Sequence, residues 1–227
     1  MFIGHFAVGF AAKRAAPRAS LGPLLAAPLL PDLLWPVFLL VGWEHARIEP
    51  GTTAFMPIVL ESYPYSHSLL FAAGWAALLA LLYWARTGYR AGSVVIALGV
   101  LSHWVLDAVT HRPDMPLYPG GPVVGLGLWN SVAGTIVVES LTFAAAVWLY
   151  LTTTKARDRI GRYACGAFVA LLVLLYVASV LSPAPPSVRA VAVGGLATWL
   201  FPFWAGWFDR HREMVTPRSP GPPPSAR

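Results

Sequence analysis

The chain has 227 residues, of which 57% are hydrophobic and only 11% are charged, and its mean hydropathy is +0.62. Soluble domains carry about 25% charged residues, so this composition excludes an ordinary water-soluble enzyme and a disordered chain. In so apolar a chain, the formal net charge of +6 points to basic residues held at one membrane face rather than to nucleic-acid binding.

The apolar runs predict an all-α, polytopic transmembrane helical bundle of about six to seven membrane segments. The first run, residues 1–12, is too short to cross about 30 Å of hydrocarbon unaided. The second, 20–43, is long enough, but it contains Pro28, Pro31 and Pro36, and because internal prolines remove helix hydrogen bonds we expect a broken helix. Further spans are expected over approximately 66–85, 92–111, 130–151, 162–181 and 187–208.

These segments form one predicted transmembrane domain, residues 1–208. A basic, Pro-rich tail follows over residues 209–227, and we expect it to be disordered. Because Lys13 and Arg14 follow the first apolar run instead of preceding it, we expect no cleaved signal peptide.

Basic residues predict the orientation in the membrane, because 13 of the 16 Lys and Arg residues lie in four stretches that seven segments would place on one side. The positive-inside rule assigns that side to the cytoplasm. We therefore expect a multi-pass protein of the bacterial inner membrane with its N-terminus outside and its C-terminus in the cytoplasm. The stretches hold Lys13, Arg14 and Arg18; Arg86 and Arg90; Lys155, Arg157, Arg159 and Arg162; and Arg210, Arg212, Arg218 and Arg227.

Several ionisable side chains fall inside the predicted spans, where they are costly and mark functional sites. His103, Asp107 and His111 are spaced i, i+4, i+8, so they share one helix face. The predicted orientation gathers the histidines in the outer half of the membrane, with Asp32 about halfway across. Imidazole and carboxylate ligands suit Zn, Mn or Fe. The predicted metal ligands are His5, Asp32, His67, His103, Asp107 and His111, and zinc is the expected metal.

Other polar residues leave alternatives open. Asp107 and Glu139 are candidate general bases, although Asp107 could instead pair with Arg112, and Glu139 could form a structural hydrogen bond. Residues 111–131, rich in Pro and Gly, form an outer loop in which Arg112, Asp114 and Asn130 orient a substrate, or which only caps the bundle. The candidate catalytic residues are Asp107, Glu139 and Arg112. Glu44 and His45 are expected to be solvated in an outer loop.

Four motifs resemble a bacterial family of inner-membrane proteins. They are Gly4-His5, LLPD at 29–32, His67-Ser68 and SHxxxD at 102–107, so the resemblance covers roughly residues 1–140. The family is that of the YdjM-like membrane-bound metal-dependent hydrolases, which are also described as LexA-binding. The resemblance implies hydrolase activity, with metal binding by His5, Asp32, His67, His103 and Asp107.

The chain departs from this family pattern at two places. Leu33, Leu34 and Trp35 follow the PD pair, where the family commonly has a second acid or histidine, and only Tyr63 and Tyr65 precede the HS pair, where it commonly has another histidine. These departures argue against a second metal and make His111 a substitute for a lost ligand.

Three functions follow as hypotheses. The first is a metal-dependent hydrolase at the outer membrane face that acts on an ester or phosphoester, with a lipid as one candidate substrate. The second is a transporter or permease that uses the same cluster to handle protons or a cation. The third is a membrane scaffold in which the cluster is structural. The expected partners are the lipid bilayer and such a substrate, and no nucleic acid.

Overall fold

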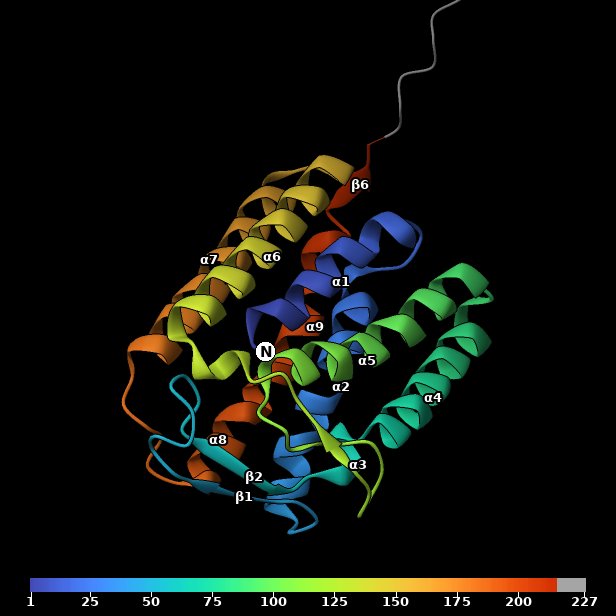
Figure 1. The fold of residues 1–227 in the computed structure, drawn as a ribbon. Coiled ribbons are helices and arrows are strands. Elements are labelled where there is room, and N and C mark those ends of the chain that lie inside the picture. The colour runs from blue at the N-terminus through green and yellow to red at the C-terminus, as the bar shows by residue number, and fades with distance from the viewer. Residues whose placement is uncertain (216–227) are drawn as a thin grey trace, which may run out of the picture.

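The computed structural model describes residues 1–215 as a helical bundle (Figure 1). Within these residues, six helical segments are long and apolar enough to span a membrane, which confirms the predicted all-α polytopic bundle. The spans are Leu21–Leu40, Leu69–Thr87, Arg90–Thr110, Val132–Thr153, Arg159–Leu181 and Val188–Asp209. The short first helix is not among them.

The elements alternate between long helices and short polar connections. The helices are α1 (Ile3–Ala15), α2 (Leu21–Leu40), α3 (Pro64–His67), α4 (Leu69–Thr87), α5 (Arg90–Thr110), η1 (Leu128–Asn130), α6 (Val132–Thr153), α7 (Arg159–Leu181), α8 (Val188–Gly195), η2 (Leu196–Trp199) and α9 (Leu200–Asp209). Three antiparallel strand pairs join them: β1 (His45–Ile48) with β2 (Ile58–Ser62), β3 (Met115–Pro116) with β4 (Val123–Val124), and β5 (Thr154–Ala156) with β6 (Arg212–Met214).

The predicted break in the second segment does not occur, because α2 continues through Pro28, Pro31 and Pro36. Each internal proline removes one helix hydrogen bond, but α2 is packed against α1, α5 and α9, and side chains from other helices also donate to its carbonyls. His103 bonds to the carbonyl of Pro28, and the indole of Trp199 bonds to that of Leu33. The irregular span is instead the last one, where η2 separates α8 from α9.

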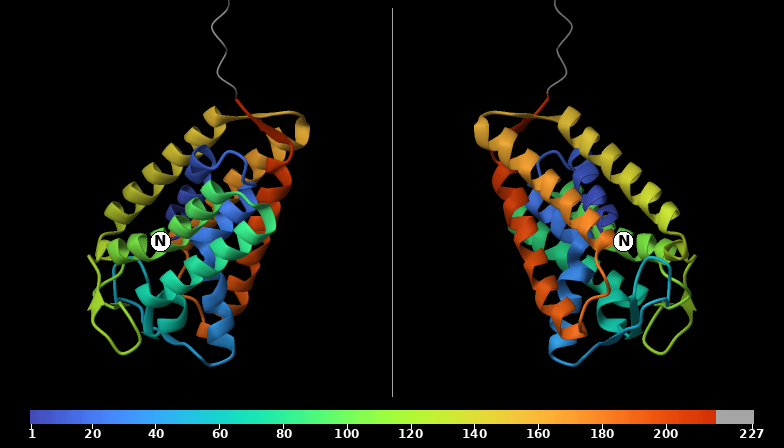
Figure 2. Two further views of the ribbon diagram at one scale, coloured as in Figure 1. Left: turned by 90° about the vertical axis from the view of Figure 1, so that its right-hand side faces the viewer. Right: turned by 90° about the vertical axis from the view of Figure 1, so that its left-hand side faces the viewer.

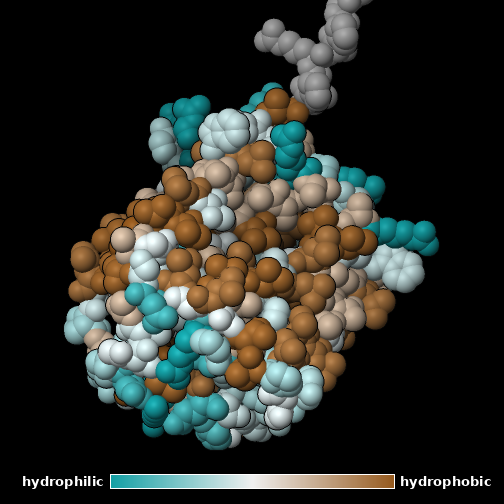
Figure 3. Space-filling view, in the orientation of Figure 1, coloured by the Kyte–Doolittle hydropathy of each residue, from teal (hydrophilic) through white to brown (hydrophobic). Residues whose placement is uncertain are grey.

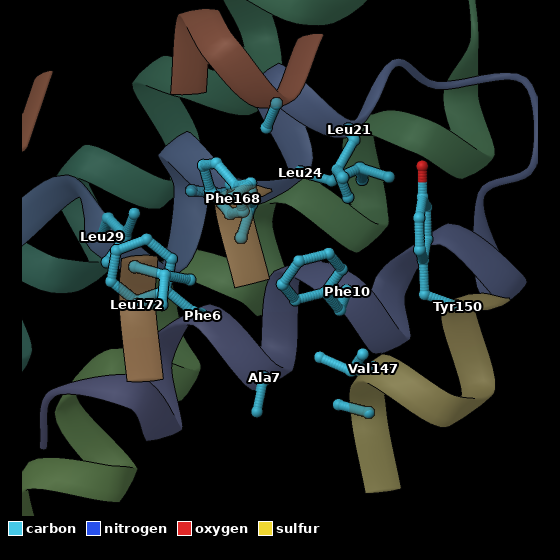
Figure 4. Close-up of a cluster of buried hydrophobic side chains, with 14 of the residues drawn as sticks. Phe6, Ala7, Phe10, Leu21, Leu24, Leu29, Val147, Tyr150, Phe168 and Leu172 are labelled. Atoms are coloured by element: carbon cyan, nitrogen blue, oxygen red, sulfur yellow. The ribbon is translucent and has the colours of Figure 1, made fainter. Parts of the chain in front are cut away.

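Helix α1 lies at the centre of the bundle and packs against α2, α5 and α6. Its Phe6 and Phe10 are fully buried, and Figure 4 shows them among Leu24, Tyr150 and Phe168. The longer helices therefore surround this short helix in the membrane region. Because its side chains are buried among them, the segment is apolar although it is too short to span the membrane.

The surface separates into an apolar belt and two polar ends. Figure 3 shows hydrophobic residues over the middle of the helices and hydrophilic residues at both ends of the molecule. Large side chains on α4 to α7 are exposed within that belt, for example Leu81, Leu141 and Leu174. This pattern is that of a surface facing lipid, because no water is available there to solvate polar groups.

The connections that carry most basic residues lie together at one end, in the upper part of Figure 1, and Figure 2 shows the same grouping from two sides. At this end the buried Lys13 donates to Asp209, whose carboxylate also accepts from Tyr150 and from the backbone N–H of Leu21. Asp209 thus ties α9 to three other helices. Compensated burial of this kind is needed because an unpaired charge there would be costly.

Part of the segment predicted as a disordered tail is structured. Residues 212–214 form β6, and the buried Arg212 donates to Thr154 and to the carbonyl of Gly161. These bonds give the segment after α9 a fixed place on the α6–α7 connection. The remainder of the predicted tail, 216–227, lies outside the described residues.

Candidate functional site

Five of the six predicted ligands converge at the end of the bundle opposite the basic connections. His5, His103 and Asp107 offer ligand atoms within 4.8 Å of one another, and so do Asp32, His67 and His103. The two groups share His103. They come from α1, α2, α3 and α5, so the site is built where four helices meet near the N-terminus (Figure 1).

Asp107 lies at the centre of this cluster and uses its two carboxylate oxygens differently. Oδ1 is 3.0 Å from His5 Nε2 and also accepts from the amino group of Met1. Oδ2 is 3.0 Å from His103 Nε2 and 3.8 Å from both His67 Nε2 and His111 Nε2. One buried carboxylate therefore connects two sides of the cluster.

Asp32 forms the open side of the cluster. Its Oδ1 is 3.5 Å from His67 Nε2 and 3.9 Å from His103 Nε2. Its side chain is 35% exposed, whereas those of His67, His103 and Asp107 are at most 4% exposed. Access to the cluster from outside the protein is therefore past Asp32.

The hydrogen bonding of His103 shows which nitrogen faces the cluster. Its Nδ1 lies 2.7 Å from the carbonyl oxygen of Pro28, and a carbonyl only accepts, so Nδ1 carries the hydrogen. In the neutral ring, Nε2 then carries a lone pair. This nitrogen is 3.0 Å from Asp107 Oδ2 but forms no hydrogen bond of good geometry. Two acceptors this close in a buried site require a positive charge between them, either a proton or a metal ion.

The residues present fit a divalent transition metal. Three imidazoles and two carboxylates are the ligand types that Zn, Mn and Fe take. The hydrogen bond of His103 to the carbonyl of Pro28 also fits a metal ligand, because metal-binding imidazoles usually donate their other N–H to a carbonyl or carboxylate.

His111 lies at the edge of this cluster. It stacks on Tyr63 with ring centroids 6.2 Å apart and packs at 4.1 Å on Trp129. Its Nδ1 is 3.1 Å from Asp114 Oδ1, so its Nε2 turns towards Asp107. Burial lowers the pKa of His111, which favours the neutral ring. Burial opposes ionisation of Asp114, but its hydrogen bonds to His111, Arg112 and Tyr63 outweigh burial and hold its pKa below the usual range.

Glu139 and Arg112, two of the predicted catalytic residues, have other partners. Glu139 Oε2 accepts from the backbone N–H groups of Phe2 and Gly4, so it caps the start of α1. Arg112 donates to Asp114 and to Thr52, not to Asp107. The ion pair between Asp107 and Arg112 that the sequence left open is therefore not formed.

The loop over residues 111–131 is tied to the end of α5. Leu126 donates to the carbonyl of Ala108, and Gly127 donates to that of His111. At Gly125 the backbones approach so closely that a Cβ would collide with the carbonyl groups of His111 and Arg112. The loop thus forms a fixed cap beside the cluster, while Asn130 stays exposed.

Two residues near the site were not identified from the sequence. Glu44 was expected to be solvated, but it is 1% exposed and accepts from both the backbone N–H and the hydroxyl of Ser66. Ser66 in turn contacts His67 Nδ1 at 2.6 Å. No periodic pattern connects Glu44 with Ser66, and both lie in short connections, so the sequence offered no signal for this pairing.

Fold and site together define a polytopic α-helical membrane protein with a buried His/Asp cluster at one end of its bundle. The family model for the YdjM inner membrane protein matches residues 1–185. This match covers most of the chain, so the protein belongs to the YdjM inner membrane protein family, as its motifs predicted, and it is a multi-pass inner-membrane protein. No curated protein and no solved structure gives a significant match.

Proposed function

We propose that the protein is a metal-dependent hydrolase whose site opens at the outer face of the membrane. The observation that carries the proposal is the contact at Asp107, where a carboxylate oxygen lies 3.0 Å from His103 Nε2 in a buried site. A metal ion among His5, Asp32, His67, His103 and Asp107 would compensate both groups. When bound, such a metal supplies an activated water for hydrolysis at neutral pH.

The residues of this chain have distinct tasks in that proposal. The three imidazoles and Asp107, all of them buried, would hold the metal. Asp32, at the open side of the cluster, would complete the ligand set or accept a proton from water. Arg112, held by Asp114 and Thr52 directly after His111, offers a positive charge to an anionic substrate group.

We propose an ester or phosphoester as the substrate, and a lipid as its source. The cluster is formed near helix ends, with His5 in the first turn of α1, His67 at the end of α3 and Asp107 in the last turn of α5. A lipid head group occupies this depth, while its acyl chains lie along the belt. Hydrolysis at this level needs no movement of the substrate through the bundle.

The packing below the cluster supports hydrolysis over transport. Between the cluster and the buried Lys13 at the other end, α1 presents Phe6 and Phe10, which pack against Phe168 and Phe143. A route for protons or cations would need polar groups or water along this length. Among the described residues, that stretch of the core is apolar and aromatic.

Elemental analysis of the purified protein tests the proposal. The protein is prepared with an affinity tag that lacks histidine and in buffers free of chelators. We expect stoichiometric Zn, Mn or Fe in the wild type and in His45→Ala, an exposed histidine outside the cluster. We expect little metal in His103→Ala and in Asp107→Asn. A wild-type protein without a transition metal, even after incubation with each ion, would overturn the proposal.

An activity measurement separates the substrate classes. Protein reconstituted in vesicles is incubated with a metal and offered phospholipid or a water-soluble phosphoester. We expect release of product from the lipid, lost in Asp107→Asn and retained in His45→Ala. Uptake driven by a pH gradient and abolished by Asp32→Asn, without hydrolysis, would favour the transporter.

A further inference from the structure

A buried carboxylate lies behind His67, on the side of the ring away from the cluster. Glu44 Oε1 accepts from the backbone N–H of Ser66 at 2.8 Å, and its Oε2 accepts from the Ser66 hydroxyl at 2.6 Å. The Ser66 hydroxyl oxygen lies 2.6 Å from His67 Nδ1. Glu44, Ser66 and His67 are 1%, 0% and 4% exposed, so solvent does not compete for these bonds.

The protons in this chain of contacts can be assigned from the donor inventory. A serine hydroxyl has a single hydrogen, and a carboxylate only accepts. Ser66 therefore donates its hydrogen to Glu44 and must accept from His67, so the His67 hydrogen is on Nδ1. The other ring nitrogen, Nε2, then carries a lone pair, and it lies 3.5 Å from Asp32 Oδ1 and 3.8 Å from Asp107 Oδ2.

The position of Glu44 is itself fixed by the backbone. Its N–H bonds to the carbonyl of Phe38 at 3.2 Å, which anchors the residue to the end of α2, the helix that carries Asp32. Ser66 and His67 belong to α3. The chain of hydrogen bonds thus sets the orientation of His67 relative to Asp32 across two elements.

We propose that Glu44 is a positioning residue of the cluster, which acts through Ser66 to hold His67 in the tautomer that presents Nε2 to a metal ion. This inference rests on the proposed metal site, but the tautomer itself does not depend on a bound metal. Outer partners of this kind usually change metal affinity by about 10–100-fold when removed. Glu44 therefore affects metal binding without being a ligand.

The informative variant is Glu44→Gln, which keeps the size and shape of the side chain. The amide oxygen can still accept from the Ser66 N–H, but the amide nitrogen then donates to the Ser66 hydroxyl. Ser66 must direct its own hydrogen towards His67 Nδ1, and His67 moves its hydrogen to Nε2, into the cluster. We expect a metal affinity lower by about 10–100-fold and a reversed tautomer. Ser66→Ala, which leaves His67 Nδ1 without a partner, should give a smaller loss.

The matched control is Glu61→Gln in β2, a half-exposed glutamate that contacts Arg47 at the surface. The experiment measures metal affinity by competition with a chelating dye. It also follows the ring nitrogens of His67 by NMR of metal-free protein labelled with ¹⁵N-histidine, the signal being assigned with His67→Gln. The control should match the wild type in both measurements.

The two readouts separate this inference from the proposed function. Metal-free wild type with the hydrogen on Nδ1, reversed in Glu44→Gln, supports the positioning role even if no metal binds, in which case only the hydrolase proposal fails. If Glu44→Gln keeps the wild-type tautomer and a metal affinity within twofold of the wild type, the positioning role is wrong. Folding of each variant is checked by its melting temperature in detergent.

Discussion

Asp107 and Glu139 are both buried acids of the membrane region, but they have different partners. Asp107 faces imidazoles and a terminal amino group. Glu139 instead accepts two backbone N–H groups at the start of α1. Helix N-termini leave such groups without partners, and their partial positive charge stabilises a nearby carboxylate. Asp107 is therefore part of the cluster, whereas Glu139 holds the start of α1, the helix that carries His5.

This division predicts the effect of Glu139→Ala. The N–H groups of Phe2 and Gly4 lose their acceptor in a buried site, so we expect the free energy of unfolding to fall by about 1–2 kcal/mol, the usual cost of a lost helix cap. Because His5 directly follows Gly4, metal affinity should also decrease. Glu139→Gln keeps an acceptor oxygen and should lose less. Unfolding in detergent by denaturant measures the change.

The control for this variant is Val138→Ala, at a partly exposed neighbouring position on α6. Its loss of a lipid-facing methyl pair should have little effect on α1. If Glu139→Ala and Val138→Ala were equally stable and bound metal equally, the capping role would be contradicted.

The residues of the candidate site could be predicted from the sequence, but the residues that support them could not. The i, i+4, i+8 spacing placed His103, Asp107 and His111 on one face because helix geometry is regular. Glu44 could not be placed, because its role depends on a contact with Ser66 that no repeat spacing encodes. Periodicity in a sequence indicates which side chains share one face of a helix. A hydrogen bond between two connecting segments, in contrast, depends on how the whole chain packs.

At the scale of elements, α1 and α2 depart most from what their sequences indicate. The spans expected from 66 to 181 agree with α4 to α7 within a few residues. The prolines of α2 suggested a break, but the helix is continuous and is packed against α1, α5 and α9. Propensity arguments assume an isolated helix, and tertiary packing overrides them here.

The close packing of α1 on α2 depends on a glycine and gives an element-scale prediction. A Cβ on Gly9 would lie 2.9 Å from both the carbonyl oxygen of Leu24 and the Cα of Leu25. Backbone atoms cannot move aside like a flexible side chain, and small residues are what permit such close helix contacts in membranes. We expect Gly9→Val to lower the free energy of unfolding by about 1–3 kcal/mol, the usual cost of overpacking.

Gly74 provides the matched control, because it is also inside a membrane helix, α4, and a Cβ there would meet nothing within 4 Å. Both variants bear the same helix-propensity change, so the difference between Gly9→Val and Gly74→Val isolates the contact between α1 and α2. Equal melting temperatures in detergent would show that this contact does not limit the stability of the bundle.

At the scale of the whole molecule, the arrangement of charge is the feature that the sequence predicted most directly. The basic connections between α1 and α2, α4 and α5, and α6 and α7 share one end of the bundle, and the cluster lies towards the other (Figure 1). This separation follows from the alternation of helix directions, which the number of spans determines. A cap over residues 111–131, which hold β3 and β4, was one interpretation that the sequence left open, but nothing in the sequence indicated the second strand pair, β1 with β2.

The orientation of this bundle in the membrane gives the last prediction. The positive-inside rule places the basic end in the cytoplasm and the cluster outside. The chain has one cysteine, the buried Cys165, so single cysteines can be introduced in a Cys165→Ala background without interference. We choose Ala54→Cys in the β1–β2 connection and Thr87→Cys at the end of α4, both exposed positions.

In intact bacteria, a membrane-impermeant maleimide should label Ala54→Cys and not Thr87→Cys. After the membrane is permeabilised both should react, which shows that Thr87→Cys is accessible to the reagent. Labelling of Thr87→Cys alone in intact cells would place the cluster on the cytoplasmic side, and the proposed substrate would then have to come from the inner leaflet or the cytoplasm.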